Sequence, residues 1–457
     1  MRSKLLSVMV LLVVIASLLV GCAAPTQAPA ESSTQQSEQA ADNSAATQAP
    51  AETGTDPVTL KVWIGWGDNP AQLQSLFDRF GEEYGVKVEV NANVPLDKII
   101  PALSGNEPPD VLIYGWPDVV STWSREGLIK PLNQVITDNA IDMDDIIPAT
   151  LSYCQLGDEY YCLPWGTDLS VLYWNKTLFE EAGLDPETPP ASWEELSAMA
   201  EKLTIIEDGE IQQLGFISDY PWTHSDILLA LNGGSWYSED GKTVTINTPE
   251  MIETLNFQQQ FYKKYGTEEV LKFIASGGQY ASPDQAFYAG KLAMYIDGEW
   301  QPSPNFIQKY KPELDFGIAP VPAPEAKSEF ANSVTLAGSV VVIPTETKNP
   351  ELAGKMLAWL MRGDIIAEQM YNNFNIPTSK SAFADPRFSE NEYLSLMCDL
   401  AASPNARPLD FGPVAGDMSA KLAEVEEKVL HFEQDPAPLL EEAQIYLQEK
   451  LDQALGQ

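Results

Sequence analysis

The stretch VTLKVWI, residues 58–64, alternates apolar and polar side chains, which predicts a β-strand with one buried face. Residues 73–80 then carry Leu and Phe at helical spacing, and residues 86–90 alternate again. Residues 97–103 have a helical pattern, and the apolar run at 111–114 is typical of a short buried strand. Strand, helix, strand, helix and strand at this spacing predict an α/β fold with a largely parallel sheet covered by helices.

The N-terminus has the form of an export signal. Arg2 and Lys4 precede an apolar run at 5–20 that is too short to span a bilayer comfortably. The residues LVGC, which end at Cys22, resemble the lipobox of bacterial lipoproteins, in which the signal is cut before the cysteine and the thiol is acylated. We therefore expect residues 1–21 to be a signal peptide and Cys22 to carry a lipid such as palmitate. A signal that ends in Cys by chance and a short membrane anchor are the alternatives.

The segment after Cys22 differs sharply in composition from the rest of the chain. Residues 23–57 are almost entirely Ala, Pro, Gln, Ser, Thr, Glu and Asn, with no aromatic side chain. Such a segment cannot bury a core, so we expect residues 22–57 to form a lipidated, disordered linker. About 400 residues follow it, which is more than one ordinary domain holds, so we expect two lobes.

The chain is strongly acidic, with 66 Asp and Glu against 27 Lys and Arg and a formal net charge of −39. This charge repels phosphates and argues against nucleic acid as a partner. It suits solubility in an extracytoplasmic space, yet it says little about the ligand.

Two cysteines lie close together in the segment YCQLGDEYYC, at Cys154 and Cys162. Gly157 and Asp158 between them are a turn signal, so the cysteines could face each other across a hairpin. In an oxidising compartment we expect them to form a disulfide. Metal binding is the weaker interpretation, because His224 and His431 are the only histidines and neither is near this pair in the sequence.

Sequence motifs give no support for an enzyme or for a cofactor. Residues 233–237 begin like a nucleophile elbow but end in Tyr237 where the motif needs Gly. Residues 241–243 mimic the end of a phosphate-binding loop, but Trp236 stands where that loop needs its first Gly. Paired carboxylates remain possible, although the abundance of Asp and Glu makes any one pair uninformative. We therefore expect a binding protein without cofactor or metal.

Aromatic and acidic residues recur where predicted strands end and loops begin, which is where open parallel sheets bind ligands. The apolar face of a sugar ring stacks on an aromatic side chain, and its hydroxyls donate to carboxylates, so this combination points to a sugar. For any one aromatic residue, a place in the core is about as plausible as a ligand contact. The candidates are Trp66, Asp68, Tyr114, Trp116, Asp118, Trp165, Asp168, Trp222, Trp236, Asp297 and Trp300.

Five short elements, in the same order, resemble those of the extracellular solute-binding proteins of ABC transporters, the broad family that includes maltose-binding protein. Residues 105–111 (GNEPPDV) resemble G-x-x-P-D-V, and residues 126–132 (EGLIKPL) resemble G-L-L-x-P-L. Residues 172–176 (LYWNK) match L-x-Y-N-K except for a Trp at the Tyr position. Residues 179–196 are similar to F-E-E-A-G-L-D-P…P-P-x-T-W-E-E-L, and residues 287–294 to F-x-x-G-K-A-A-M. The resemblance covers nearly all of the chain after the linker.

The resemblance implies a two-lobed periplasmic-binding-protein fold of type II, with hinge strands that cross between the lobes and a ligand cleft between them. It implies an N-terminal lobe of residues 58–164 and 316–361, and a C-terminal lobe of residues 165–315 and 362–457. Of the candidate ligand residues, it supports Trp300 most strongly, then Asp168 and Tyr114, and it adds Phe411 in a late loop. Asp297 stands where many relatives carry Asn, which leaves the sugar open.

The implied partners are a small solute, a sugar above all, and a membrane permease driven by a separate ATPase, since the chain has no phosphate-binding loop of its own. The protein is then expected to be a monomer, held by its lipid at the outer face of the cell membrane or in the periplasm. A binding protein for a polyamine, peptide or other small solute is one alternative, because aromatic and acidic residues suit cations equally well. A surface-anchored glycoside hydrolase that uses two carboxylates is another.

Overall fold

The computed structural model describes residues 58–67, 69–105 and 107–456. The predicted signal peptide (1–21), the lipid attachment at Cys22, the linker (22–57) and the candidate ligand residue Asp68 lie outside the described residues. Within the described part of the chain, no helix is both long and apolar enough to cross a membrane.

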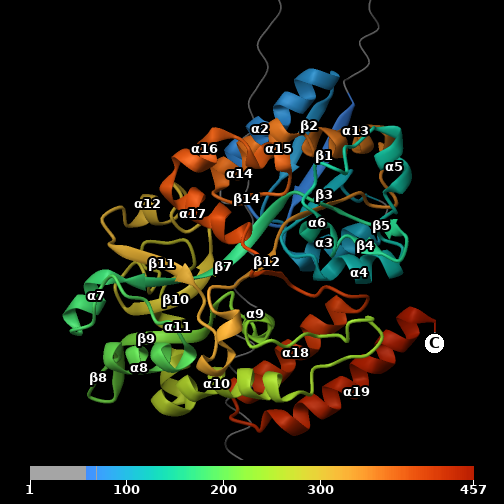
Figure 1. Ribbon diagram of the computed structural model, residues 1–457. Helices are drawn as coiled ribbons and strands as arrows, with labels where there is room; N and C mark the ends of the chain where they lie inside the picture. Colours follow the sequence, from blue (N-terminus) through green and yellow to red (C-terminus); the bar gives the residue numbers. More distant parts are fainter. Residues whose placement is uncertain (1–57, 68, 106, 457) are drawn as a thin grey trace, which may run out of the picture. The chain divides into compact units, whose positions relative to one another are not determined.

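The smaller of two large sheets has the strand order β2-β1-β3-β13-β6 (Figure 1). Strand β1 (Thr59–Ile64) pairs in parallel with β2 (Lys87–Asn91) and with β3 (Val111–Tyr114), as the alternating pattern predicts. Strands β13 (Val340–Val342) and β6 (Leu163–Pro164) extend the sheet in the antiparallel sense. The first three predicted strands therefore lie in this sheet, and the two predicted helices connect them.

Helix α2 (Pro70–Tyr84) shows how local sequence sets these elements. The side chain of Asn69 caps its start by accepting from the backbone N of Gln72 at 3.2 Å, and Pro70 stands at the first turn, where its missing N–H costs nothing. Gly85 ends the helix at φ +70°, a conformation that side chains with a Cβ adopt rarely. The apolar face of α2, predicted at 73–80, is buried against the sheet.

The larger sheet has the order β15-β12-β7-β10-β9-β8, and two further strands, β11 and β14, also pair with β7. Strand β7, the long green strand near the centre of Figure 1, is antiparallel to β10, β11, β12 and β14. Strand β10 is buried along its whole length and runs parallel to β9. The bounds are β7 (Gly166–Asn175), β8 (Ile205–Glu207), β9 (Glu210–Pro221), β10 (Leu292–Gly298), β11 (Phe316–Pro320), β12 (Val334–Ala337), β14 (Ile376–Pro377) and β15 (Ala406–Pro408).

Helices connect and cover the strands of both sheets. Helix α18 lies against α4 and against α19, so the C-terminal segment contacts a helix that follows β3 (Figure 1). The remaining elements are α3 (Leu96–Leu103), α4 (Asp118–Arg125), α5 (Asn133–Asp138), α6 (Pro148–Leu151), α7 (Lys176–Glu181), α8 (Trp193–Leu203), α9 (Ser225–Leu231), α10 (Pro249–Tyr265), α11 (Thr267–Ser276), α12 (Ile307–Tyr310), η1 (Glu325–Phe330), α13 (Pro350–Leu360), α14 (Gly363–Asn373), α15 (Lys380–Phe383), α16 (Pro386–Glu390), α17 (Glu392–Ala401), α18 (Ala415–Leu430) and α19 (Pro436–Leu455).

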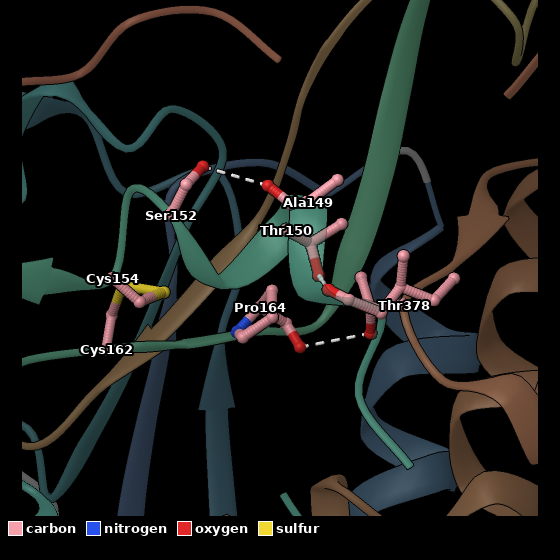
Figure 2. The surroundings of a disulfide bond; sticks show 8 residues. Ala149, Thr150, Ser152, Cys154, Cys162, Pro164 and Thr378 are labelled. Carbon is pink, nitrogen blue, oxygen red and sulfur yellow. Dashed lines mark hydrogen bonds between the residues drawn. A yellow bond between two sulfur atoms is a disulfide. The ribbon is translucent and has the colours of Figure 1, made fainter. Parts of the chain in front are cut away.

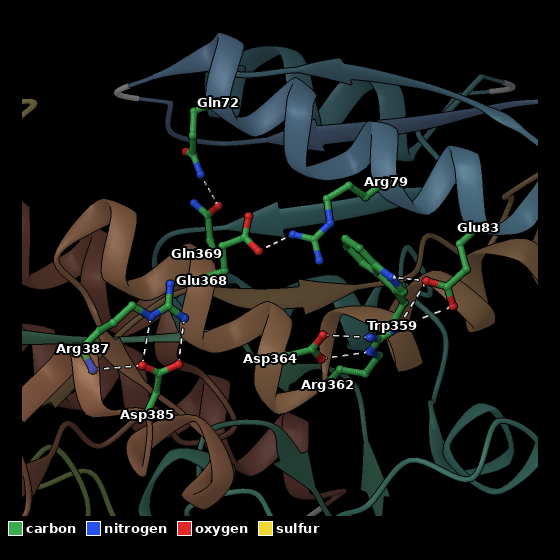
Figure 3. A network of polar contacts seen from close by, with 10 residues as sticks. All are labelled: Gln72, Arg79, Glu83, Trp359, Arg362, Asp364, Glu368, Gln369, Asp385 and Arg387. Carbon is green, nitrogen blue, oxygen red and sulfur yellow. Dashed lines mark hydrogen bonds and ion pairs between the residues drawn. The ribbon is translucent and has the colours of Figure 1, made fainter.

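Two observations bear on the lobe boundaries, which stay a prediction. Strands β11 and β12 belong to the larger sheet, although the predicted N-terminal lobe includes residues 316–361. Helix α14, assigned to the C-terminal lobe, contacts α2 through the bond from Gln72 Nε2 to Gln369 Oε1 (3.0 Å), and Arg362 just before it pairs with Glu83 (3.2 Å) (Figure 3). The strand pairing favours placing β11 and β12 with the C-terminal lobe, and these contacts favour placing α14 with the N-terminal lobe.

A disulfide joins Cys154 to Cys162 around a small hairpin (Figure 2). Strands β4 (Gln155–Leu156) and β5 (Glu159–Tyr160) form its arms, and Gly157 takes φ +64° in the turn, as the Gly-Asp pair predicts. The Cα atoms of the cysteines lie 4.9 Å apart, and both side chains are buried. A bridge over so short a loop restrains the unfolded chain by about 2–3 kcal/mol, and it fixes the path into β6.

Candidate functional site

Five of the candidate ligand residues line one cavity, which we call the Trp300 cavity. They are Trp116, Asp168, Trp222, Asp297 and Trp300. The rest of its wall consists of Leu169, Ser170, Thr223, Ile227, Ile296, Gly298, Thr335, Ala337 and Leu409. Residues far apart in the sequence therefore converge on one place, and the aromatic and acidic pattern at the strand ends points to it.

The register of the larger sheet brings the two acidic residues of this cavity to the same part of β7. In the pairing of β7 with β10, Asp297 lies opposite Val171. In the pairing of β7 with β12, Asp168 lies opposite Ala337. β10 and β12 flank β7 on opposite sides, and Asp168 and Asp297 both line the Trp300 cavity although they are 129 positions apart, from 168 to 297.

A network of hydrogen bonds holds Asp297 and the ring of Trp300. Asp297 is buried, and its Oδ2 accepts from Gln301 Nε2 at 2.7 Å while its Oδ1 accepts from the Tyr280 hydroxyl at 3.3 Å. The same Tyr280 hydroxyl accepts from Trp300 Nε1 at 2.6 Å. Burial, followed by the charge of Asp297, raises the pKa of Tyr280 well above its usual value, so its proton stays available for this bond. The rings of Trp222 and Tyr280 also form an edge-to-face contact, with centroids 5.1 Å apart.

A second network connects Asp168 to a buried glutamate. Asn375 donates through Nδ2 to Asp168 Oδ1 at 3.0 Å and to Glu299 Oε1 at 2.8 Å. The other oxygen of Glu299 accepts from the backbone N of Leu169 at 2.8 Å. Burial, and next the charge of Asp168, raises the pKa of Glu299 well above its usual range. Asn375 therefore positions Asp168 at the cavity wall and links it to Glu299.

Phe411 supports the aromatic side of the cavity from behind. It is buried, and its ring meets Trp116 edge-on with centroids 5.6 Å apart. It makes similar contacts with Tyr153 at 5.9 Å and Trp236 at 6.2 Å. The late loop that contains Phe411 is thus joined to the loop after β3, although Phe411 does not itself line the Trp300 cavity.

The other candidate residues lie outside the Trp300 cavity, and Trp165 corrects our expectation most clearly. Trp165 is 0% exposed and packs against Trp66 and Phe77, with centroids 6.2 and 6.4 Å apart, so it is a core residue.

Trp66 donates from Nε1 to Ser339 Oγ at 3.0 Å. Tyr114 packs edge-on against Trp123. Burial, followed by the charge of nearby Asp118, raises the pKa of Tyr114 to about 12. Asp118 begins α4, and Trp236 lines a different cavity.

Sequence reasoning missed the residues that hold the site from behind. Tyr280, Glu299, Gln301 and Asn375 each bond to a wall residue of the Trp300 cavity or to its backbone. Tyr280 follows the pair Gly277-Gly278, so the search for aromatic residues in loops could have found it. Asn375 carries no such signal, because only the pairing of β14 with β7 brings it to Asp168.

Comparison with known proteins shows which family the chain belongs to. The model of the family described as "Bacterial extracellular solute-binding protein" matches residues 66–362, more than half of the chain. The chain belongs to this family. An ABC transporter extracellular-binding protein of Pyrococcus horikoshii is 24% identical to it over 349 residues, which are 71% of this chain and 72% of the relative. The sn-glycerol-3-phosphate-binding periplasmic protein UgpB of Escherichia coli is 24% identical over 352 residues, 71% of this chain and 75% of UgpB.

Among solved structures, this solute-binding protein is similar to CpMnBP1 with mannobiose bound. The TM-score is 0.78 at 25% sequence identity, and the match covers 85% of this chain and 99% of CpMnBP1. The mannotriose complex of CpMnBP1 gives a TM-score of 0.77 at 26% identity. The two-lobed binding-protein fold predicted from the sequence is thereby confirmed.

The Trp300 cavity of this solute-binding protein has a volume of about 40 Å³. Ligand pockets typically measure about 300–1,000 Å³. The Trp300 cavity is therefore much smaller than a usual ligand site. A ligand the size of a sugar ring requires the walls of the cavity to separate.

Acidic groups and one histidine gather beside the cavity, between α4, α9 and α18. Burial raises the pKa of Asp118, at the start of α4, to about 6, against an opposing bond from Ser419. His224 Nδ1 lies 3.5 Å from Glu426 Oε2, and this bond raises the pKa of His224 to about 9. Since the side chain of His224 is 60% exposed, solvent screens the pair, and we assign it no energy. Within the described residues, no group of three or more His, Cys, Asp or Glu could hold a metal ion.

Replacing Asp226 by Asn is expected to raise the free energy of unfolding by about 1–2 kcal/mol at pH 8. Burial raises the folded-state pKa of Asp226 from 3.8 to about 6, while the charge of His224 lowers it and that of Glu426 raises it. The folded state therefore binds the proton more tightly than the unfolded state, and the cost of ionisation grows as pH rises from about 4 to about 6. Urea unfolding at pH 8 and pH 4.5 measures the gain, which shrinks at the lower pH.

Asp240→Asn is the control for this prediction, because the pKa of Asp240 is lowered by its bond to Ser238. A lowered pKa stabilises the fold above the unfolded-state value, so this change is expected to lower stability at pH 8. An Asp226→Asn protein that is less stable than the wild type at pH 8 would contradict the assignment. The backbone bond from Ile227 N to Asp226 Oδ1 at 2.8 Å can form with either side chain.

Proposed function

We propose that this solute-binding protein captures a mono- or oligosaccharide outside the cytoplasm and delivers it to the permease of an ABC importer driven by a separate ATPase. The convergence of three Trp rings and two carboxylates on the Trp300 cavity carries this proposal. The rings offer apolar faces to sugar rings, and the carboxylates accept hydroxyl protons. The similarity to CpMnBP1, which was solved with mannobiose and with mannotriose, supports the same ligand class.

The walls of the cavity favour a neutral polyol over a phosphate ester. UgpB is named for sn-glycerol-3-phosphate, and phosphate sites use Arg, Lys or helix N-termini. Among the described residues that line the Trp300 cavity there is no Arg and no Lys, and two are Asp. A phosphate would be repelled there, so we place glycerol phosphates outside the ligand class.

Lobe closure follows from the size of the cavity. At about 40 Å³ the Trp300 cavity cannot admit a sugar while the rings of Trp116, Trp222 and Trp300 hold their positions. Trp116 follows β3 of the smaller sheet, whereas Asp168 and Asp297 lie in the larger sheet and Trp300 follows its strand β10. We infer that the two sheets separate to admit the ligand and close on it. Buried hydrogen bonds then select the sugar, because a misplaced hydroxyl leaves a partner unpaired.

We infer further that the protein binds and releases its ligand unchanged, as a monomer, and that a lipid on Cys22 holds it at the membrane. Residue Cys22 lies in the LVGC sequence, and the linker of residues 22–57 would let the folded part reach the permease. Metabolic labelling with palmitate tests the anchor, since Cys22→Ser is expected to lose both the label and the membrane association. A Cys22→Ser protein that stays labelled at the membrane argues against it.

A thermal-shift screen of the purified mature protein over a carbohydrate panel tests the proposed function. A ligand that binds only the folded state raises the unfolding temperature, and calorimetry then gives its affinity. Stabilisation by putrescine or spermidine with none by any sugar would overturn the sugar assignment in favour of a cation. Release of reducing sugar from glycans by the pure protein would show an enzyme instead.

A further inference from the structure

A second and larger cavity, which we call the Arg407 cavity, adjoins the Trp300 cavity. Its volume is about 420 Å³, within the range of about 300–1,000 Å³ that is usual for ligand sites. Leu409 lines both cavities, and the consecutive residues Asp226 and Ile227 line one each. Phe411 touches Trp116 of one cavity and Trp236 of the other. The two spaces therefore lie on either side of one short segment of chain.

We propose that the Arg407 cavity is a second saccharide subsite, so that the ligand has at least two sugar units, one in each cavity. This inference rests on the proposed function and specifies the length of its ligand. It also assigns ligand contacts to residues outside the Trp300 cavity, above all to Arg407, Trp236 and Asp410, which line the second space.

Arg407 is the first observation that points to a ligand. It belongs to β15, and its guanidinium lies over the ring of Phe330, 4.1 Å from the centroid. Within the part of the chain that the structure describes, its Nε is shielded from solvent and has no hydrogen-bond partner, and none of the ion pairs involves Arg407. In a chain with 66 Asp and Glu, an arginine without a carboxylate partner at the wall of a cavity is available for a ligand.

Trp236 is the second observation. Its side chain is 5% exposed, and Nε1 has no hydrogen-bond partner among the described residues. A buried indole N–H usually finds a partner, because leaving it unpaired costs about 1–3 kcal/mol. Trp236 therefore adds an aromatic surface to the cavity wall, while its indole N–H is shielded from solvent.

Carboxyl groups, which accept hydrogen bonds, also line the Arg407 cavity. Asp410 accepts from Ser235 Oγ at 2.7 Å, and burial raises the pKa of Asp410. Asp226 is buried at another point of the same wall. Two carboxyl groups disfavour an anion, and the guanidinium of Arg407 disfavours a cation. A hydrocarbon would leave the donors unpaired, whereas a sugar ring has a face for Trp236 and hydroxyls that both donate and accept.

The test is calorimetry of two length series, mannose to mannotriose and glucose to maltotriose, on the mature wild-type protein and on Arg407→Met. The wild type is expected to bind the disaccharide of its series at least about tenfold more tightly than the monosaccharide, since one charge-assisted hydrogen bond contributes this much. Arg407→Met is expected to lose this gain with length and to keep the monosaccharide affinity. Met retains the length of the apolar stem that lies over Phe330.

Arg387→Met is the matched control, because the guanidinium of Arg387 also lies over an aromatic ring, that of Tyr371, at 5.2 Å. Its partner is Asp385 (Figure 3), and neither residue lines either cavity. This change should leave every affinity as in the wild type. Thermal melting checks that each variant folds, and Asp410→Asn, which keeps an acceptor for Ser235, decides the matter if Arg407→Met does not fold.

The outcomes separate the inference from the function on which it rests. If neither sugar series binds the wild type, the proposed function is overturned and the subsite with it. If monosaccharide and trisaccharide bind equally well, and Arg407→Met and Asp410→Asn bind them as the wild type does, the second subsite is overturned while the function stands. A gain with length that is lost in Arg407→Met and kept in Arg387→Met supports the subsite.

Discussion

Replacing Asp168 by Asn is expected to weaken saccharide binding about tenfold, since a hydrogen bond to a charged acceptor is worth about 1.5–3 kcal/mol, one to a neutral acceptor about 0.5–1.5 kcal/mol, and 1.4 kcal/mol is a factor of ten. The carboxylate lines the Trp300 cavity, and Asn375 and Glu299 hold it from behind. Asn has the same shape and can still accept from Asn375, so the network survives. The expected loss comes from the change of a charged acceptor into a neutral amide at the cavity wall.

Stability is expected to move in the opposite direction. The charge of Asp168 is the second cause, after burial, of the raised pKa of Glu299. A carboxyl whose pKa is raised in the folded state lowers stability above its unfolded-state pKa of about 4.5, so removing the charge reduces this cost at pH 7. Asp168→Asn should therefore unfold at the same temperature as the wild type or a higher one.

Calorimetric titration and thermal melting of the same protein preparation check this prediction. Asp385→Asn is the control, because Asp385 forms an ion pair with Arg387 at 2.8 Å (Figure 3) and does not line the cavity. It should bind sugar as the wild type does. Unchanged affinity in Asp168→Asn would remove this residue from the ligand site, and lost affinity together with a lowered melting temperature would point to a structural role instead.

Local patterns were enough to predict the three parallel strands of the smaller sheet. Residues 58–64 and 86–90 alternate because one face of each strand is covered by helices and the other face is less buried. The same logic located much of the Trp300 cavity, since residues after strand ends converge wherever neighbouring strands end together. Asp297 and Trp300 were found in this way.

Contacts that depend on the register of distant strands could not be predicted from the sequence. Asn375 reaches Asp168 only because β14 pairs with Gly166 and Thr167 at the start of β7. Glu299 is surrounded by residues that were chosen as candidates, yet its burial and its raised pKa follow from packing rather than from spacing. Burial likewise decides which aromatic residues belong to the core, and the position of a Trp in the sequence does not show whether its side chain is buried.

Trp165 and Trp222 differ most in burial, and replacing Trp165 is expected to change the free energy of unfolding strongly. Trp165 is completely buried and packs against Trp66 and Phe77. Trp165→Ala is expected to lower the free energy of unfolding by about 3–5 kcal/mol, because it removes a large buried side chain and leaves a cavity that its neighbours fill only in part. The indole N–H of Trp165 has no hydrogen-bond partner among the described residues, so no polar contact adds to this loss.

Trp222→Ala is the matched change at the other extreme of burial. Its side chain is 52% exposed, so the loss of stability should stay within about 1 kcal/mol, while sugar affinity falls because Trp222 lines the Trp300 cavity. Urea unfolding and calorimetry of both variants give the two quantities side by side. A stable Trp165→Ala protein that has lost sugar binding would restore Trp165 to the ligand site. The expected result is the reverse, because a ring that packs on all sides within the core has no face left for a sugar.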